Sequence, residues 1–131
     1  MSEEARPEPG GSAVIAAFTD LIFGARIHAA ATAHGVSTKV STAPERIVQA
    51  VQQGACTVFV DLDVRAADPV ALIARLKADE IMRDTPIVAF ASHVRTDAIQ
   101  AARDAGADQV LARGAFARQL PDLVRSAGPA E

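Results

Sequence analysis

The sequence predicts an α/β domain in which helices cover both faces of a five-stranded parallel sheet. Short β-favouring runs alternate five times with longer segments whose apolar residues recur at helical spacing. Most of the short runs are continuously apolar, which is typical of parallel strands buried on both faces. At 131 residues, 50% of them hydrophobic, the chain is long enough for one domain with one core.

The ordered domain is expected to cover residues 13–127, with a disordered tail at 1–12 and a short C-terminal tail at 128–131. The N-terminus lacks the basic and apolar regions of a secretion signal, so we expect a cytoplasmic protein. The first segment cannot build a packed face, because it is rich in acidic residues, proline and glycine: Glu3, Glu4, Pro7, Pro9, Gly10 and Gly11.

The first half of the domain predicts two strand–helix pairs. The first helix, from Leu21 to His34, is closed by Gly35, which favours a left-handed cap. The second helix is expected up to Gly54, with Thr42 as its N-cap and Pro44 in its first turn. The first strand is continuously apolar and the second alternates like an edge strand, and we expect them at Val14–Phe18 and Val36–Ser41.

The second half predicts three further strand–helix pairs. Asp68 is expected to cap the third helix, and Thr96-Asp97 the fourth, which ends at Gly106. The last helix contains Pro121, which is expected to delay or kink it. The three strands are again β-favouring runs, at Thr57–Val60, Pro86–Phe90 and Gln109–Leu111.

Composition excludes several classes of function. The formal net charge is −3 and the chain has no Trp or Tyr, so a nucleic-acid-binding domain, which should be basic and carry stacking platforms, is disfavoured. A single cysteine excludes an internal disulfide, and three scattered histidines lack metal-ligand spacing. No apolar stretch approaches the roughly 20 residues of a membrane helix, so no membrane partner is expected.

Polar residues follow the ends of the predicted strands. In an open α/β sheet, ligand sites lie beyond the carboxyl ends of the strands, near the point where strand order reverses. These ends therefore hold the candidate site residues: Thr19, Asp20, Ser41, Thr42, Asp61, Asp63, Ala91, Ser92, His93 and Arg113.

Three segments around these ends carry a resemblance to a known family: Val58-Phe-Val-Asp61, Pro86-Ile-Val-Ala-Phe-Ala-Ser-His93 and Gly106-Ala-Asp-Gln-Val-Leu-Ala-Arg113. With these segments in this order and spacing, residues 13–127 resemble the receiver domains of bacterial response regulators. The resemblance implies a flavodoxin-like, doubly wound sheet in the order 2-1-3-4-5, flanked by five helices. It also implies two-component signalling, in which a phosphoryl group is transferred onto the aspartate that ends strand three, here Asp61.

The sequence departs from this family where a receiver holds Mg²⁺. In direct alignment the acidic pair that ends strand one falls on Phe18 and Thr19, and neither chelates a hard cation as a carboxylate does. Asp20 lies one residue further on, so a metal, if one binds, would use Asp20 and Asp61. Because a metal contributes several kcal/mol to phosphoryl transfer, we expect this loss to slow the reaction by roughly three orders of magnitude.

The rest of the phosphoryl pocket is altered as well. The family's hydroxyl residue falls on Ala91, with Ser92 beside it as a substitute, and the family's lysine falls on Arg113, a larger and planar cation. The proline after the lysine falls on Gly114, and the aromatic switch residue falls on Val110. We therefore expect a degenerate pocket around Asp61, formed by Phe18, Thr19, Asp20, Asp63, Ala91, Ser92 and Arg113.

The expected function is that of a stand-alone, receiver-like signalling module that acts by protein–protein contact, is not an enzyme and needs no cofactor. The resemblance implies a histidine kinase or another signalling protein as the partner. By analogy with the family, the contact surface comprises the fourth helix, the fifth strand and the fifth helix, here the exposed positions from Thr96 to Arg125. A homodimer through that surface stays open.

Two alternatives to this function stay open. One is a phosphorylatable receiver, in which Asp61 accepts a phosphoryl group with Mg²⁺ as cofactor. The other is a small aspartate-nucleophile phosphatase, because Asp61-Leu-Asp63 resembles the haloacid-dehalogenase pattern. That family has threonine or serine two residues beyond the second aspartate, and this chain has Arg65.

The acidic residues also have purely structural interpretations. Asp61 can form an ion pair with Arg113 across the strand ends. Asp63 can stabilise its own turn through its side chain, and Asp20 can cap the helix that follows it. On these interpretations none of the three carboxylates performs chemistry.

Overall fold

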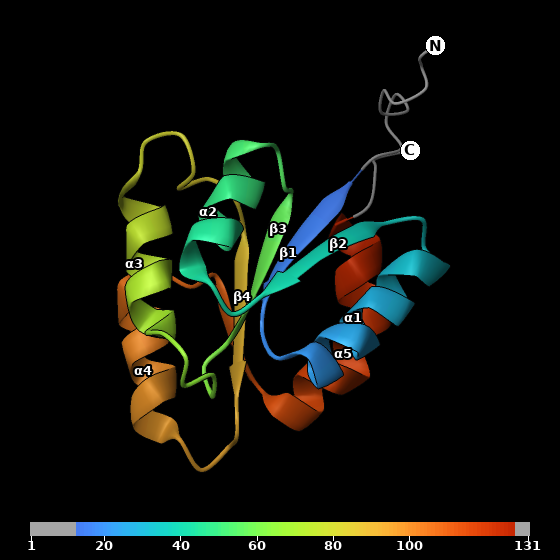
Figure 1. Cartoon of the computed structure of the whole chain (residues 1–131). Helices are drawn as coiled ribbons and strands as arrows, with labels where there is room; N and C mark the ends of the chain where they lie inside the picture. The colour runs from blue at the N-terminus through green and yellow to red at the C-terminus, as the bar shows by residue number, and fades with distance from the viewer. Residues whose placement is uncertain (1–12, 128–131) are drawn as a thin grey trace.

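The computed structural model describes residues 13–127, which form one five-stranded parallel sheet in the order β2-β1-β3-β4-β5, as the sequence predicts (Figure 1). The tails predicted at 1–12 and 128–131 lie outside the described residues. The strands are β1 (Val14–Phe18), β2 (Ser37–Ser41), β3 (Thr57–Asp61), β4 (Ile87–Ala91) and β5 (Gln109–Ala112). The helices are α1 (Leu21–Ala33), α2 (Pro44–Gln52), α3 (Pro69–Ala78), α4 (Thr96–Ala105) and α5 (Arg113–Ala127).

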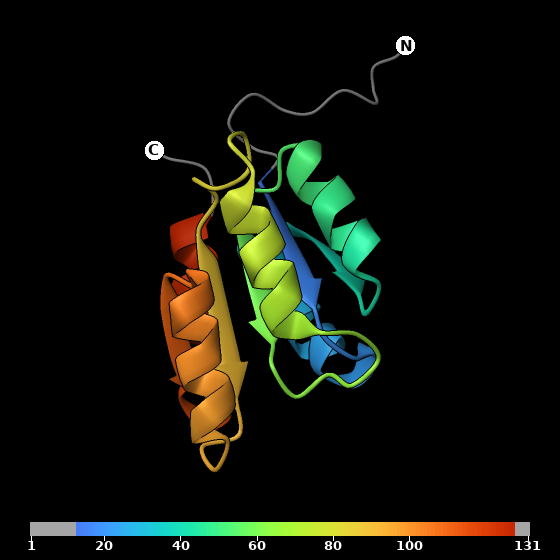
Figure 2. The same ribbon diagram turned by 90° about the vertical axis from the view of Figure 1, so that its left-hand side faces the viewer.

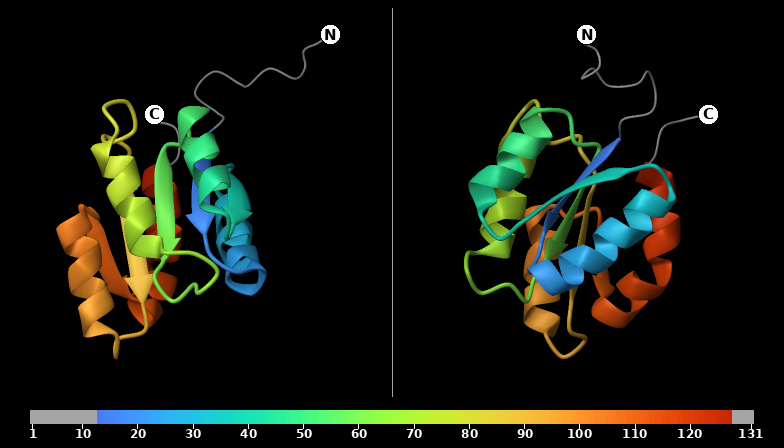
Figure 3. Two further views of the ribbon diagram at one scale, coloured as in Figure 1. Left: turned by 60° about the vertical axis from the view of Figure 1, so that its left-hand side comes forward. Right: turned by 45° about the vertical axis from the view of Figure 1, so that its right-hand side comes forward.

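The helices form two layers, one on each face of the sheet. Helices α2, α3 and α4 cover one face, which Figure 2 turns toward the viewer, and α1 and α5 cover the other, seen on the right of Figure 3. Side chains of one strand alternate between the two layers, because successive residues of a strand point to opposite faces. In β1, Ile15 and Ala17 pack against α1 and α5, whereas Ala16 and Phe18 pack against the α2–α4 layer.

Phenylalanines form the centre of the layer under α1 and α5. The rings of Phe90 and Phe116 stack with centroids 4.1 Å apart, and Phe59 meets Phe116 edge-on at 5.1 Å. Phe23 of α1 lies 5.1 Å from Phe90, so strand and helix rings form one continuous cluster. Such aromatic pairs stabilise beyond their area burial by about 0.5–1.5 kcal/mol each.

Helix α1 packs closely onto the edge strand β2. Gly24 is buried in α1, and a Cβ atom placed on it would overlap Cγ1 of Val40 in β2. A glycine is therefore needed here for close approach of helix and strand, even though glycine lowers helix propensity.

Two predicted helix caps are wrong. The N-cap of α2 is Ala43 and not Thr42, because Ser41 Oγ accepts from the Ala43 N–H and places the turn one residue later. Thr96-Asp97 lies inside α4, whose N-cap is Arg95 without a side-chain hydrogen bond.

Other features of the helices agree with the sequence. Asp68 caps α3 by accepting from the Ala71 N–H at 3.1 Å, and Gly106 ends α4 in a left-handed conformation. Pro121 lies inside α5, which begins at Arg113, so it does not delay that helix. Within residues 13–127, no helix combines the length and apolar character that a bilayer crossing requires.

Candidate functional site

Asp61 ends β3 at the carboxyl edge of the sheet and is 1% exposed. Strands β1 and β3 pair in parallel with Phe18 opposite Val60, so the next residue of each chain segment, Thr19 and Asp61, come side by side. Thr19 is equally buried. A carboxylate this deeply buried must be compensated by hydrogen bonds or an opposite charge.

Three hydrogen bonds compensate the Asp61 carboxylate. Oδ2 accepts from the Thr19 hydroxyl at 2.7 Å. Oδ1 accepts from the backbone N–H of Asp63 at 2.9 Å and from Nη2 of Arg113 at 2.6 Å. Both carboxylate oxygens are thus held by donors of the protein itself. The ion pair between Asp61 and Arg113 that the sequence suggested is confirmed.

Arg113 connects both aspartates of this edge. The same Nη2 atom that binds Asp61 also donates to Oδ2 of Asp63 at 2.9 Å. The Arg113 side chain is 32% exposed, and its guanidinium lies 4.9 Å from the ring centre of Phe23 and 5.2 Å from that of Phe90. Burial opposes the charge, but hydrogen bonds and charges of Asp63 and Asp61 outweigh it and raise the pKa of Arg113.

The side chain of Asp63 connects the carboxyl end of β3 with the loop that follows β4. Its Oδ2 accepts from the backbone N–H of Ser92 at 3.0 Å, and its Oδ1 accepts from Nη1 of Arg95 at 3.2 Å. Burial raises the pKa of Asp63, but the bonds from Arg113, Ser92 and Arg95 together lower it below the ordinary value. The predicted role of Asp63 is therefore wrong: its side chain binds neighbouring segments, and the turn after β3 is held by Asp61 instead.

Asp20 caps α1 and has no hydrogen bond to Asp61 among the described residues. Its Oδ1 accepts from the Phe23 N–H at 2.8 Å. The side chain is exposed and lines the mouth of a cleft of about 360 Å³ beside the carboxylates. We call this the Asp61 cleft; its lining residues are Asp20, Thr42, Asp61, Asp63, Val64, Arg65, Ala66 and Arg113. The capping interpretation of Asp20 is confirmed.

The residues around Asp61 do not fit a magnesium ion. Mg²⁺ needs near-octahedral oxygen ligands at about 2.0–2.1 Å, usually including free carboxylate oxygens. Here Arg113 pairs with both Asp61 and Asp63, and Arg95 pairs with Asp63. A divalent ion would have to break these ion pairs to reach the carboxylate oxygens. Among residues 13–127, no cluster of three or more His, Cys, Asp or Glu side chains could hold a metal.

Two predicted pocket residues are core residues. Phe18 and Ala91 are fully buried in the layer under α2–α4, so they do not line the Asp61 cleft. Ser92 donates its backbone N–H to Asp63 and forms no hydrogen bond with Asp61. The structure therefore brings together Thr19, Asp61, Asp63 and Arg113, with Asp20 at the rim of the cleft.

Two contacts of the site were missed from the sequence. The side chain of Thr19 was treated as a lost metal ligand, whereas pairing of β1 with β3 makes its hydroxyl the donor to Asp61 Oδ2. Arg95 donates to both the Leu62 carbonyl and Asp63. The sequence around Arg95 does not indicate these contacts, because nothing distinguishes it from any other arginine in a loop. The strand register was the signal that would have identified Thr19.

No protein-family model matches this sequence, and no curated protein matches it. Solved structures do match. A phosphorylated cyanobacterial phytochrome response regulator is 17% identical with a TM-score of 0.70, over 88% of this chain and 90% of that one. A response regulator from Thermotoga maritima is 18% identical with a TM-score of 0.70, over 88% and 97% of the two chains. An orphan response regulator of H. pylori is 18% identical with a TM-score of 0.68, over 90% and 95%.

Proposed function

We propose that this chain, which has the fold of response-regulator receiver domains, is a signalling module that acts by protein contact without efficient Mg²⁺-dependent phosphorylation of Asp61. The observation that carries the proposal is the occupation of both Asp61 carboxylate oxygens by Thr19, Asp63 and Arg113. A phosphoryl acceptor must present one oxygen to phosphorus and share another with the metal. In this site, either role requires breaking a buried, charge-assisted bond.

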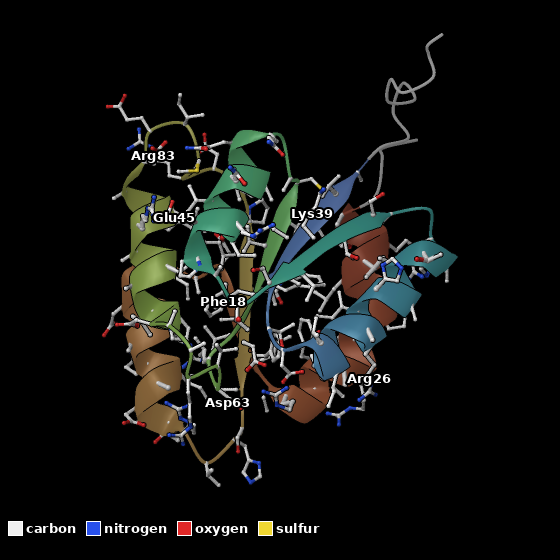
Figure 4. The ribbon with its side chains drawn as sticks, viewed as in Figure 1. Phe18, Arg26, Lys39, Glu45, Asp63 and Arg83 are labelled. Atoms are coloured by element: carbon white, nitrogen blue, oxygen red, sulfur yellow. The ribbon has the colours of Figure 1, made fainter. Side chains whose placement is uncertain are left out.

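The charges of the site support the same proposal. Asp61 and Asp63 contribute two negative charges, and Arg113 and Arg95 supply two positive ones at hydrogen-bond distance. A divalent cation entering the Asp61 cleft would meet a neutral cluster instead of an uncompensated acidic pair. Figure 4 shows Asp63 beyond the carboxyl end of the sheet, while Phe18 lies within the fold. The side chain that replaces the first family acid is thus apolar and buried.

The contact surface we propose lies at the start of α1. Leu21 and Ile22 are 80% and 88% exposed, and Val94 of the β4–α4 loop is 73% exposed. All three follow the carboxyl ends of strands, at the edge of the sheet that carries Asp61. The expected surface on residues 96–125 contains none of the large apolar side chains that are most exposed among the described residues. Leu21 and Ile22 are adjacent in the first turn of α1, and neighbouring exposed apolar side chains favour a protein partner.

A phosphorylatable receiver is the second candidate, favoured by the position of Asp61 at the end of β3. The phosphatase has less support. Its second aspartate would have to donate a proton, whereas Arg113 and Arg95 hold the pKa of Asp63 below its ordinary value, against the burial that opposes them. Low pKa values keep a carboxyl ionised at neutral pH, which is unsuitable for a general acid.

The first experiment compares amide NMR spectra of the full chain with and without millimolar Mg²⁺ and beryllofluoride. We expect no change at Thr19, Asp61 or Asp63. A response regulator that binds beryllofluoride under the same conditions serves as the positive control. Saturable shifts around Asp61 that disappear in Asp61→Asn would establish the second candidate and refute the proposal.

The second experiment tests the contact surface. Ile22→Glu replaces an exposed apolar side chain at the start of α1, and it should leave the free energy of unfolding within about 0.5 kcal/mol of the wild type. Ile81→Glu is a matched control, because Ile81 is similarly exposed but precedes β4 at the opposite end of the sheet. Concentration-dependent sedimentation that Ile22→Glu alone abolishes would identify a homodimer through this surface.

A further inference from the structure

A second pocket of about 470 Å³ lies between α1 and α5, and Arg113 lines both this pocket and the Asp61 cleft. We call it the Phe23 pocket; it is formed by Phe23 and Arg26 of α1, Ser92 and His93 of the β4–α4 loop, and Arg113 and Gly114 at the start of α5. Its volume lies in the range of small-molecule sites, about 300–1,000 Å³. None of its lining residues is acidic.

The guanidinium groups of two arginines lie over the ring of Phe23. The guanidinium carbon of Arg113 lies 4.9 Å from the ring centre, and that of Arg26 lies 5.7 Å from it. Arg113 binds Asp61 and Asp63 through Nη2 alone, so its Nε and Nη1 donors have no acceptor among residues 13–127. Arg26 makes no ion pair within the same residues. Figure 4 shows Arg26 on α1 beside α5.

A third arginine borders the Phe23 pocket. Nη1 of Arg118 lies 3.6 Å from the position that a Cβ atom on Gly114 would occupy, and Gly114 lines the pocket. Gly114 belongs to the first turn of α5, a helix of 15 residues, so the positive end of the helix dipole lies there as well. Arg26 and Arg118 form no ion pair among residues 13–127, whereas Asp61 and Asp63 already compensate part of the Arg113 charge. A bound anion would reduce the repulsion between these cations.

We propose that the Phe23 pocket binds the phosphate group of a phosphate monoester. Arg26 and the free N–H groups of Arg113 would donate to the phosphate oxygens, and the Phe23 ring would contact the apolar part of the ligand. Guanidinium groups match phosphate geometry, and neighbouring arginines favour the double negative charge of a phosphate monoester. The shared chemistry is the phosphate group, whether on a small molecule or on a phosphorylated residue of a partner. The Phe23 pocket shares Arg113 with the Asp61 cleft, but phosphate binding there does not depend on the proposed function.

The test is a titration of the ¹⁵N-labelled full chain with inorganic phosphate, O-phosphoserine, a short phosphoserine peptide and, as the uncharged control, serine. EDTA is present, and chloride keeps the ionic strength constant. We expect saturable shifts at Phe23, Ser92 and Gly114 with each phosphate compound and none with serine. Tighter binding of the peptide than of O-phosphoserine assigns the phosphate to a partner, and the reverse order assigns it to a small molecule.

Two arginine variants decide whether the site is specific. Arg26→Gln removes a donor of the pocket and should weaken phosphate binding about tenfold, the effect of one charge-assisted hydrogen bond. Arg46→Gln removes the same charge from α2, on the other face of the sheet, and should leave the affinity unchanged. Equal weakening by both variants, or no saturable shift in the wild type, overturns the proposal. Because Mg²⁺ and beryllofluoride are absent, that result leaves the proposal about Asp61 standing.

Discussion

Nη2 of Arg113 lies 2.6 Å from Oδ1 of Asp61. This ion pair connects the residue that follows β5 with the carboxylate that ends β3. The pair is unequal, since Asp61 is 1% exposed and the Arg113 side chain is 32% exposed. Removal of the cation therefore leaves a buried charge, whereas removal of the carboxylate leaves a cation that still has Asp63 and solvent.

Arg113→Met is expected to lower the free energy of unfolding by about 3–5 kcal/mol, because it leaves the buried Asp61 carboxylate without its counter-ion. Urea denaturation at pH 7 measures the loss. The same substitution in an Asp61→Asn background should cost much less. Equal losses of stability in the two backgrounds would show that the ion pair between Arg113 and Asp61 does not contribute to the free energy of unfolding.

Thr19→Val is expected to lower the free energy of unfolding by about 1.5–3 kcal/mol, since it keeps the shape of the side chain but removes the donor to Asp61 Oδ2. Thr19→Ser retains the hydroxyl and should lose less. The comparison by denaturant unfolding isolates the hydrogen bond, and a valine variant as stable as the serine variant would contradict its role.

The free energy of unfolding should fall as the pH drops below about 4. Burial raises the pKa values of Asp63 and Asp108, but Arg113 and Lys77 respectively, with backbone N–H donors, lower them in the folded state. Their contribution is complete above the unfolded pKa, about 3.9, and is lost as the pH falls through the lower folded values. Thermal unfolding across pH 2–7 measures this loss.

Asp63→Asn should flatten the acid part of that pH profile, because an amide has no proton to gain. Asp84→Asn is the matched control, since Asp84 is an exposed residue of the α3–β4 connection with no ion pair among residues 13–127. If stability falls with decreasing pH as steeply in Asp63→Asn as in Asp84→Asn, Asp63 is not a source of the acid sensitivity.

Gly24→Ala is expected to destabilise the protein by about 1–3 kcal/mol, because the added methyl overlaps Val40 and forces α1 away from β2. Alanine favours a helix more than glycine does, so propensity alone predicts the opposite sign. Chemical denaturation distinguishes the two. The cost of Gly24→Ala should shrink when Val40→Ala provides room for the methyl.

The sequence was sufficient to predict the sheet because β1, β3 and β4 are apolar on both faces. Runs such as Val14–Phe18 have no other stable location than the middle of a two-layer domain, and the strand order followed from the family resemblance. The Arg113–Asp61 pair was likewise predictable, since Asp61 ends β3 and Arg113 directly follows β5 at the same edge of the sheet. These features depend on patterns that extend over many residues.

The local details depended on atoms that the pattern does not specify. Thr42 was a reasonable cap, but Ser41 offered a hydroxyl one residue earlier and moved the cap to Ala43. The Thr19 hydroxyl and Arg95 gained their partners only through tertiary placement beside Asp61 and Asp63. The Phe23 pocket arises in the same way, because its arginines come from helices far apart in the sequence.

Lys77 donates to the Arg83 carbonyl at 3.0 Å, the Thr85 carbonyl at 3.3 Å and Asp108 at 2.9 Å, and these bonds connect α3 to the segments that precede β4 and β5. The only other lysine in the chain is Lys39, which lies exposed on the edge strand β2. The two side-chain amines thus differ sharply in their freedom to react. An acylating reagent or an amine-directed crosslinker will modify Lys39 well before Lys77, so a covalent adduct on a lysine reports on the β2 edge.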